Sequence, residues 1–289
     1  MHIRIPNKIR KNILYILPHK VAHSYIYWSF HKVILNWNDL QLYDEKIHWL
    51  IAYRYNETYG KYVDKYLVRS YVEKCGLKNL LIPLIGVFDK PKDINYEILP
   101  EQFILKATHG SGNNFYEICY DRNSLNEKRV NQKFGKALKS NFAKQQCEYQ
   151  YNGAKPRIIC EVLLEGKKNI KITDYKVVCS NGKPRCILVC TNRDEGRDYY
   201  STDWQYLDFV KKEYHSKVKT EKPQCLAEML CAAAILSKPF PLARIDFYVV
   251  DKKLYFGEIT LSPGGGNHEY LSIHGQRELG KMVDLSRQG

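Results

Sequence analysis

The 289-residue sequence lacks the patterns that mark several common classes of protein. Its nine cysteines include no Cys-x-x-Cys pair, so the usual zinc-binding arrangements are not indicated. No Gly-x-x-x-x-Gly-Lys-Ser/Thr loop and no Asp-x-Asp pair occurs, and there is no internal repeat or low-complexity tract. These absences argue against a Walker-type phosphate loop, a repeat array and a disordered chain.

A long uninterrupted hydrophobic run is also missing. The most apolar stretch, residues 13–35, has too many polar residues for a membrane span of ~20 residues. Six positions interrupt it: Pro18, His19, Lys20, His23, His31 and Lys32. A basic, aromatic helix lying on a membrane or a partner is an alternative to an ordinary packed helix. No apolar segment with a cleavage site follows the basic residues 1–11, so we expect no secretion signal.

The composition is that of a folded globular protein. Hydrophobic residues make up 44 % of the chain and aromatic residues 13 %, and the length suits about two domains. The formal net charge of +14 favours anionic partners, among them nucleotides, acidic glycans, nucleic acids and anionic membranes. Several cysteines lie inside apolar runs, as expected for free, buried thiols in a reducing cytoplasm, and we expect a cytoplasmic protein.

Hydrophobic periodicity predicts an α+β protein. Helical spacing dominates residues 43–76, and a polar, proline-containing connection at 90–100 suggests a boundary between subdomains. We predict three regions, namely a helical region over 1–100, a subdomain with a glycine-rich hairpin over 101–165 and a C-terminal subdomain over 166–289. Within them we predict strands over 80–88, 103–107, 115–120, 157–164, 174–179 and 185–190, a hairpin over 243–260, and helices over 126–146, 223–238 and 277–284.

The hairpin over 243–260 carries the most informative polar residues. A three-residue loop over 251–253 would place Asp246 directly opposite Glu258, and Arg244 opposite Thr260. Two opposed carboxylates repel each other unless a cation lies between them, and oxygen ligands of this kind suit Mg²⁺. A surface hairpin with one solvated polar face is the alternative.

A second candidate site is the turn after the strand over 103–107. Its backbone can approach a polyphosphate, and Lys106 adds a positive charge at the strand end. The turn itself contains His109, Gly110, Ser111 and Gly112. A plain glycine-rich hairpin tip is the alternative.

Three further positions have residue types suited to nucleotide binding. The strand end at Glu161, Val162 and Leu163 has backbone groups for an adenine edge, and a carboxylate for a ribose, although a plain strand end has the same pattern. Lys176 and Arg193 add cations on neighbouring strands, where they suit phosphate or carboxylate groups, or are simply surface charges.

Taken in order, these segments resemble the ATP-grasp superfamily, and in detail its TupA-like branch, which is found with bacterial surface-polysaccharide and teichuronopeptide biosynthesis. The resemblance covers roughly residues 43–285. It rests on five ordered motifs: Asp64-Lys65-Tyr66 with Val68-Arg69; residues 106–112; Asp174-Tyr175-Lys176 with residues 181–184; Asn192-Arg193; and Arg244-Ile245-Asp246 through Glu258 to the glycine run at 264–266.

The resemblance implies an ATP-grasp fold, in which two α+β lobes clamp ATP and Mg²⁺ after an N-terminal helical region. It implies that Lys106 contacts phosphate under a mobile lid hairpin, that residues 161–163 contact adenine, and that Asp246 and Glu258 hold Mg²⁺. Thr260 stands where many relatives have an asparagine as a third metal ligand. Arg193 and Arg244 would stabilise an oxyanion with Lys176 nearby, and the substrate would meet Gly264, Gly265, Gly266 and His268. His268 would serve there as a proton acceptor, or is a bystander that only follows the glycine run in sequence.

The function implied is an ADP-forming carboxylate–amine ligase that passes through an acyl phosphate. The expected substrates are a uronic acid or other acidic sugar unit of a bacterial surface polysaccharide, such as a capsule, and an amine. We expect no nucleic acid partner, but the basic N-terminus suggests peripheral contact with a membrane or with biosynthetic machinery. A glycosyltransferase of a polysaccharide locus and a non-enzymatic basic module that binds nucleic acid or membrane are the alternatives.

Overall fold

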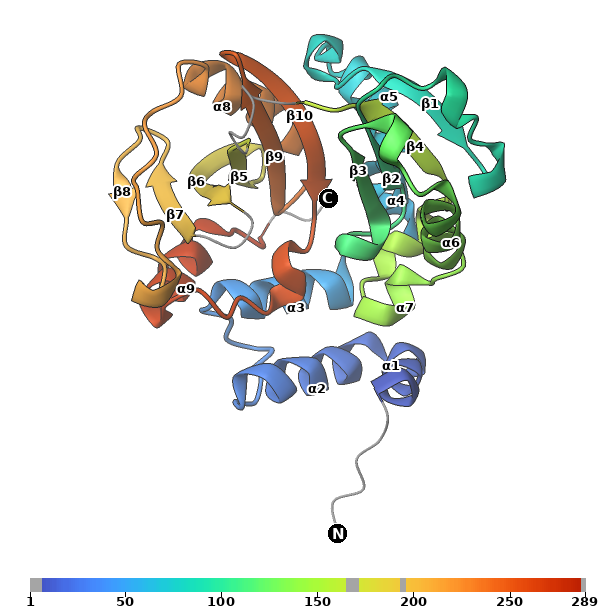
Figure 1. Ribbon diagram of the computed structural model, residues 1–289. Coiled ribbons are helices and arrows are strands. Elements are labelled where there is room, and N and C mark those ends of the chain that lie inside the picture. The colour runs from blue at the N-terminus through green and yellow to red at the C-terminus, as the bar shows by residue number, and fades with distance from the viewer. Residues whose placement is uncertain (1–6, 165–171, 193–195, 287–289) are drawn as a thin grey trace.

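The computed structural model describes residues 7–164, 172–192 and 196–286, and two antiparallel sheets form its framework (Figure 1). The first sheet has the strand order β1-β4-β2-β3 and the second has the order β10-β9-β5-β6-β7-β8. The strands are β1 Leu84–Phe88, β2 Phe103–Ala107, β3 Tyr116–Cys119, β4 Ile158–Val162, β5 Asp174–Ser180, β6 Lys183–Asn192, β7 Gly196–Ser201, β8 Tyr206–Leu207, β9 Ala243–Val250 and β10 Lys253–Thr260.

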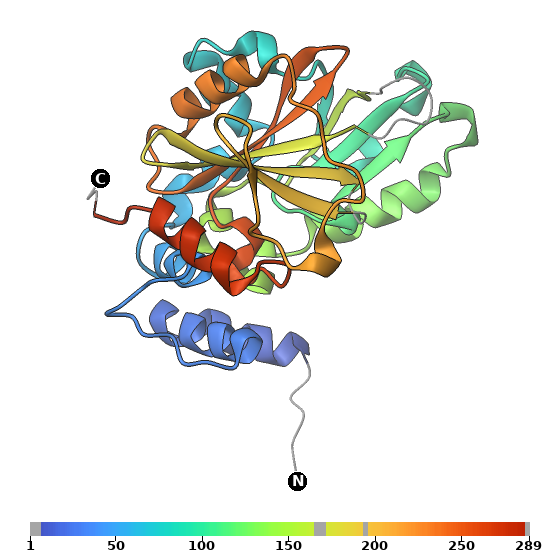
Figure 2. The same ribbon diagram turned by 90° about the vertical axis from the view of Figure 1, so that its left-hand side faces the viewer.

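Helices cover both sheets and form a separate layer at the N-terminus. Figures 1 and 2 show α1 and α2 below the rest of the molecule, on the far side of α3 from the two sheets. The α-helices are α1 Asn7–Ile16, α2 His19–His31, α3 Tyr43–Tyr53, α4 Gly60–Val63, α5 Leu67–Lys74, α6 Glu127–Leu138, α7 Phe142–Gln146, α8 Leu226–Ser237 and α9 Ile273–Met282. Within the part of the chain that the structure covers, none of the helices has the length and apolarity needed to traverse a bilayer.

Each sheet belongs to its own hydrophobic core. The smaller core lies between α6 and the four-stranded sheet, and it includes Phe103, Leu105 and Phe134. The larger core joins the six-stranded sheet and α8 to helices from the N-terminal part of the chain, with Ile47 and Leu50 of α3 fully buried in it. This packing confirms an α+β protein with two lobes.

The lobes divide the sequence differently from the regions predicted over 1–100 and 101–165. β1 pairs with β4, with Leu84 opposite Glu161, so the four-stranded lobe begins well before residue 101. The proline-containing connection at 90–100 is not a boundary, because Ile94 and Leu99 are buried in the core of that lobe.

Most predicted elements are present, with changes at their ends. The helix predicted over 126–146 is interrupted, because the side chain of Asn141 accepts a hydrogen bond from the backbone N–H of Lys144 and starts α7 as a separate helix. The last helix begins earlier than residue 277, because Ser272 caps α9 in the same way. β7 and β8 extend the larger sheet beyond the predicted strands.

Candidate active site

Asp246 and Glu258 face each other across the β9–β10 hairpin, as the sequence predicts, although by a different backbone path. The turn has two residues, Asp251 and Lys252, both with positive φ, so Lys253 pairs with Val250. A bulge between Phe256 and Glu258 then shifts the register by one residue. The predicted three-residue loop is therefore wrong, but the bulge restores the predicted pairs Asp246–Glu258 and Arg244–Thr260.

The Asp246 carboxylate is buried between two cations. Arg244 donates to both of its oxygens, with Nε and Nη2 each 2.7 Å away, and the Lys176 ammonium lies 2.7 Å from Oδ2. β5 pairs with β9 so that Lys176 is directly opposite Asp246, and its ammonium also contacts Asp174. Burial lowers the pKa of Lys176, but Asp246 and Asp174 together raise it, so its pKa lies above the usual value. Lys176 and Arg244 are thus held as cations beside the carboxylate.

Glu258 is more accessible, with 34 % of its side chain exposed. The Lys65 ammonium lies 3.4 Å from one carboxylate oxygen, and the Thr260 hydroxyl donates to the other at 3.3 Å. Burial raises the pKa of Glu258, but Lys65, Arg244 and Lys176 together lower it to about 2. Glu258 is therefore ionised at neutral pH and open to a further ligand.

These groups have the chemistry of a magnesium site completed by a substrate. The described residues contain no cluster of three or more His, Cys, Asp and Glu side chains able to hold a metal. Asp246 and Glu258 provide two hard carboxylates on one face, and Thr260 provides a hydroxyl oxygen beside Glu258. Mg²⁺ is commonly held by one or two carboxylates together with water and phosphate oxygens, so this donor set fits Mg²⁺ bound with a polyphosphate.

A second ionic cluster lies on the four-stranded sheet. The Lys106 ammonium is 2.7 Å from one oxygen of Glu161, and the Arg69 guanidinium is 3.0 Å from the other. Glu161 lies inside β4, with a buried side chain, and not in an exposed hinge. Its carboxylate is therefore engaged by two cations, and the nucleotide contact suggested for this strand end stays a prediction.

The turn after β2 contributes only the residues at its tip to a cavity. These residues are Ser111 and Gly112, and Gly112 has a φ of +91°. Lys65 connects this turn to Glu258, because its ammonium contacts the Glu258 carboxylate and also donates to the Gly110 carbonyl at 2.8 Å. His109, which was predicted to contact the cofactor, does not line the cavity. It is buried, with Nε2 3.1 Å from the Ala137 carbonyl and its ring against Phe115. His109 therefore packs in its own lobe.

Other predicted ligands lie away from the cavity or outside the described residues. Val162 and Leu163 do not line the cavity, and the segment that follows them, 165–171, is outside the described part of the chain. Arg193 falls in the segment 193–195, which is also outside it. The adenine and oxyanion roles that the resemblance implies for these residues stay predictions.

The glycine run forms a tight turn after β10. Gly264, Gly265 and Gly266 all have positive φ, between +58° and +75°, a conformation that side chains disfavour. Gly264 and Gly265 line the cavity, as predicted for substrate contacts. Gly266 does not, because it packs against α3, where a β-carbon would lie 2.7 Å from the His48 ring.

His268 anchors this turn and is not in the cavity. Its Nδ1 contacts the buried Asp44 carboxylate of α3, and its backbone N–H donates to the same group at 3.0 Å. Gln276 of α9 also donates to Asp44, at 2.6 Å. Burial raises the pKa of Asp44, but His268 and Gln276 lower it to about 2. The geometry therefore gives His268 a structural contact in place of the predicted proton acceptor at the substrate.

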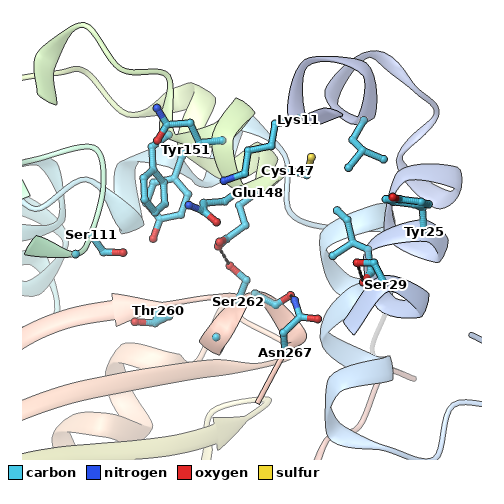
Figure 3. A pocket seen from close by; sticks show the side chains of 18 of the residues that line it. Lys11, Tyr25, Ser29, Ser111, Cys147, Glu148, Tyr151, Thr260, Ser262 and Asn267 are labelled. Carbon is cyan, nitrogen blue, oxygen red and sulfur yellow. Dashed lines mark hydrogen bonds between the residues drawn. The ribbon is translucent and has the colours of Figure 1, made fainter. Parts of the chain in front are cut away.

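A cavity of about 540 Å³ lies between the end of β10, where Glu258 is, and the N-terminal helices (Figure 3). Seven parts of the chain line it: α1, α2, the β2–β3 turn, the segment from α7 to Tyr151, Arg244 of β9, the end of β10, and the glycine turn. Glu258 and Thr260 line it, and Figure 3 shows Thr260 on the opposite side from Tyr25 and Ser29 of α2. Its size suits a small organic substrate beside the phosphate end of a nucleotide.

Glu148 is a cavity residue that the sequence did not predict. It is buried, and the Ser262 hydroxyl and the Gln150 amide, the latter at 3.3 Å, both donate to its Oε2. Its Oε1 faces the glycine turn, 3.6 Å from where a β-carbon of Gly265 would lie. Burial raises the pKa of Glu148 to about 7 in spite of those hydrogen bonds. The sequence has no signal for this residue, because it lies in an irregular segment far from Ser262.

Arg10 and Lys11 were also missed as cavity residues. Both are on α1, and Figure 3 shows the Lys11 side chain extending above the Glu148–Ser262 pair. The Arg10 Nε is buried without a hydrogen-bond partner among the described residues. The basic character of residues 1–11 is visible in the sequence, but the fold alone brings this end of the chain next to residues 258–265.

Residues 45–284 match the TupA-like ATP-grasp family. No curated protein matches the sequence. Among solved structures, a D-alanine–D-alanine ligase from Bacillus anthracis has 15 % identity and a TM-score of 0.48, with 78 % of this chain and 66 % of that chain covered. An L-amino acid ligase from Bacillus licheniformis has 14 % identity and a TM-score of 0.45, with 77 % and 45 % covered. A biotin carboxylase from Campylobacter jejuni has 13 % identity and a TM-score of 0.41, with 83 % and 46 % covered. The chain thus spans 66 % or less of the length of these three structures.

Proposed function

The chain belongs to the TupA-like ATP-grasp family, and on this premise we propose that it is an ATP-dependent carboxylate–amine ligase that releases ADP and phosphate. In the proposed reaction a carboxylate oxygen attacks the γ-phosphorus of ATP, and ADP leaves. The nitrogen of an amine then attacks the acyl carbon, the phosphate leaves, and the amine gives up a proton. The products are an amide, ADP and inorganic phosphate.

The observation that carries this proposal is the position of the charged cluster relative to the cavity. Glu258 belongs to both, since it contacts Lys65 and also lines the cavity. A polyphosphate held beside Asp246 and Glu258 would meet the cations Lys65, Lys176 and Arg244. Mg²⁺, when bound there, would neutralise charge on the transferred phosphoryl group. A carboxylate in the cavity would then lie next to that group.

Two cavity walls suit the two co-substrates. Arg10 and Lys11 supply positive charge on α1, which supports an acidic donor. Glu148 supplies a carboxyl group whose Oε1 points at the glycine turn, and it suits an amine nitrogen. A carboxyl with a pKa near 7 can accept the proton that the attacking amine gives up. The cavity therefore has an anion-binding side and an amine-binding side.

The proposed donor is a uronic acid or another acidic sugar unit, modified during biosynthesis of a bacterial surface polysaccharide. The family and the basic wall of the cavity support this choice. The cavity volume of about 540 Å³ also has room for a sugar ring. ATP and Mg²⁺ are the proposed cofactors.

Trapping with hydroxylamine tests the proposal without knowledge of the natural amine. Purified protein is incubated with ATP, Mg²⁺, hydroxylamine and, in turn, hexuronic acids and their nucleotide-linked forms, and hydroxamates are measured. An ATP-dependent hydroxamate from an acidic sugar, lost in Glu258→Gln, is the expected result. Sugar transfer that consumes no ATP would contradict it and favour the glycosyltransferase alternative.

A further inference from the structure

The N-terminal helices concentrate the exposed apolar side chains of the molecule. Half of the large hydrophobic residues that are exposed within the described chain lie between positions 13 and 34: Ile13, Ile16, Val21, Tyr25, Trp28, Phe30, Val33 and Ile34. This stretch is a small part of the sequence, so the exposure is localised. Such a concentration commonly marks an interaction surface.

On α2 these side chains form a continuous stripe. Val21, Tyr25 and Trp28 follow one another at spacings of four and three residues, which places them on one helix face, and they are 50 %, 38 % and 47 % exposed. The opposite face holds Ala22 and Tyr27, which are buried against the body of the protein. Val21 and Trp28 therefore point away from the core, and Tyr25 lies at the edge of the stripe, where it also lines the cavity. Figure 1 shows α1 and α2 as an outer layer.

The N-terminal region that contains α1 and α2 carries basic side chains and no acidic ones. Residues 1–38 contain six Lys and Arg residues and no Asp or Glu. One of these cations borders the stripe, because the Lys32 ammonium lies 5.7 Å from the Trp28 ring centre. A second, the Lys20 ammonium, lies 5.9 Å from the ring centre of the neighbouring Trp37. An apolar stripe with tryptophan and tyrosine, bordered by a lysine, has the composition of a helix that lies in a membrane interface.

We propose that α1 and α2 dock the protein on the surface of an anionic phospholipid bilayer, with Val21 and Trp28 inserted among the headgroups. The helices have 10 and 13 residues, too short to cross the hydrocarbon core, so they lie along the surface. This binding is separate from the proposed ligase activity.

Charge favours a bilayer over a second copy of the chain. A twofold dimer through this face would bring two sets of like charges together, with no acidic residue in positions 1–38 to offset them. An anionic lipid surface offers negative charge to every lysine and arginine at once. Tyr25 also lines the cavity, so docking brings the cavity close to the bilayer.

Vesicle flotation tests this surface. The full-length protein is mixed with vesicles of pure phosphatidylcholine, or with about 30 % phosphatidylglycerol, and the bound fraction is measured over a salt series. We expect strong binding to the anionic vesicles only, weakened by salt. The double variant Val21→Ser/Trp28→Ser should reduce the bound fraction by about tenfold. The matched control Ile98→Ser/Val218→Ser removes two residues that are equally apolar and 78 % and 77 % exposed elsewhere, and it should bind like the wild type.

Each other outcome overturns the proposal. These outcomes are no binding to anionic vesicles, binding that the stripe variant leaves unchanged, and equal loss in the control. Sedimentation of the same proteins without lipid provides a further check. A dimer that the stripe variant abolishes would assign this face to a second copy instead. Thermal melts of both variants establish that they are folded. The assay needs no substrate, so its result is independent of the hydroxamate assay.

Discussion

The carboxylates of Asp246 and Glu258 lie opposite each other on one face of the β9–β10 hairpin, but their surroundings differ. Asp246 is almost fully buried between Arg244 and Lys176. Glu258 is one-third exposed and borders the cavity. The two carboxylates occupy equivalent positions in the strand pairing, but substitution of Asp246 should lower the stability of the fold more than substitution of Glu258.

We predict that Asp246→Asn and Glu258→Gln both abolish activity but differ in stability. Asp246→Asn removes the anion that two buried cations share, and its free energy of unfolding should fall by about 3 kcal/mol or more. Glu258→Gln removes a carboxylate that solvent screens in part, so its melting temperature should change little. Thermal melts and Mg²⁺ titrations of the hydroxamate reaction measure both effects. Equal destabilisation by the two substitutions would be inconsistent with the buried Asp246 cluster.

A second prediction concerns Lys106, which the family resemblance implies contacts a phosphate of ATP. Lys106→Ala should weaken ATP binding by about tenfold or more, because the variant loses that cation. The fold should persist, since Arg69 still pairs with Glu161. Calorimetric titration with ATP and Mg²⁺ measures the affinity, and Lys155→Ala is the control, because Lys155 forms only an exposed ion pair with Asp89. Unchanged affinity in Lys106→Ala would remove this lysine from the nucleotide site.

Glu148 should make stability depend on pH. Its pKa rises from 4.5 in the unfolded chain to about 7 in the folded protein. The stability of the fold that depends on a protonated Glu148 is therefore fully present below pH 4.5 and is lost as the pH rises through 7. Glu148→Gln removes this loss, which amounts to up to about 3 kcal/mol. The melting temperature of the variant relative to the wild type should therefore increase from pH 5 to pH 8. Glu228→Gln, at an exposed helix position, should show no such trend; a flat difference for Glu148→Gln would show that the carboxyl titrates normally.

The nine cysteines are free, and Cys231 is the exposed one. Burial raises the pKa of Cys147 to about 11 and that of Cys160 to about 12, which slows their reaction with thiol reagents. We predict that about one thiol per native chain reacts rapidly with a disulfide reagent, and that Cys231→Ser removes that fast phase. All nine should react after unfolding. Several fast thiols in the native wild type would show that the cores open readily.

The local patterns of the sequence were sufficient to predict the charged face of the β9–β10 hairpin. Alternation along each strand fixes which residues share a face, so Asp246, Glu258 and Arg244 were found together although the turn was misjudged. The compensating bulge was not predictable, because Gly257 fits a regular strand as well as a bulge. A β-carbon there would lie 3.0 Å from the Asp246 carbonyl, a contact visible only in the folded hairpin.

The rest of the site depends on contacts between distant segments. His268 looked like a cavity residue because it follows the glycine run, but Asp44, from the first quarter of the chain, holds it in the core. Glu148 and Ser262 also meet although they are 114 positions apart in the sequence. Periodicity and motif spacing report on neighbours along the chain, so neither contact had a local signal.

Oxygen tracing tests the proposed ligase chemistry most directly. An acidic sugar that forms a hydroxamate is prepared with ¹⁸O in its carboxylate and incubated with the protein, ATP, Mg²⁺ and an amine, and the released phosphate is analysed by mass spectrometry. If a carboxylate oxygen attacks the γ-phosphorus, one ¹⁸O atom from each product amide must appear in inorganic phosphate, in step with ADP. Phosphate without the label, or label found in AMP, would contradict the acyl phosphate route.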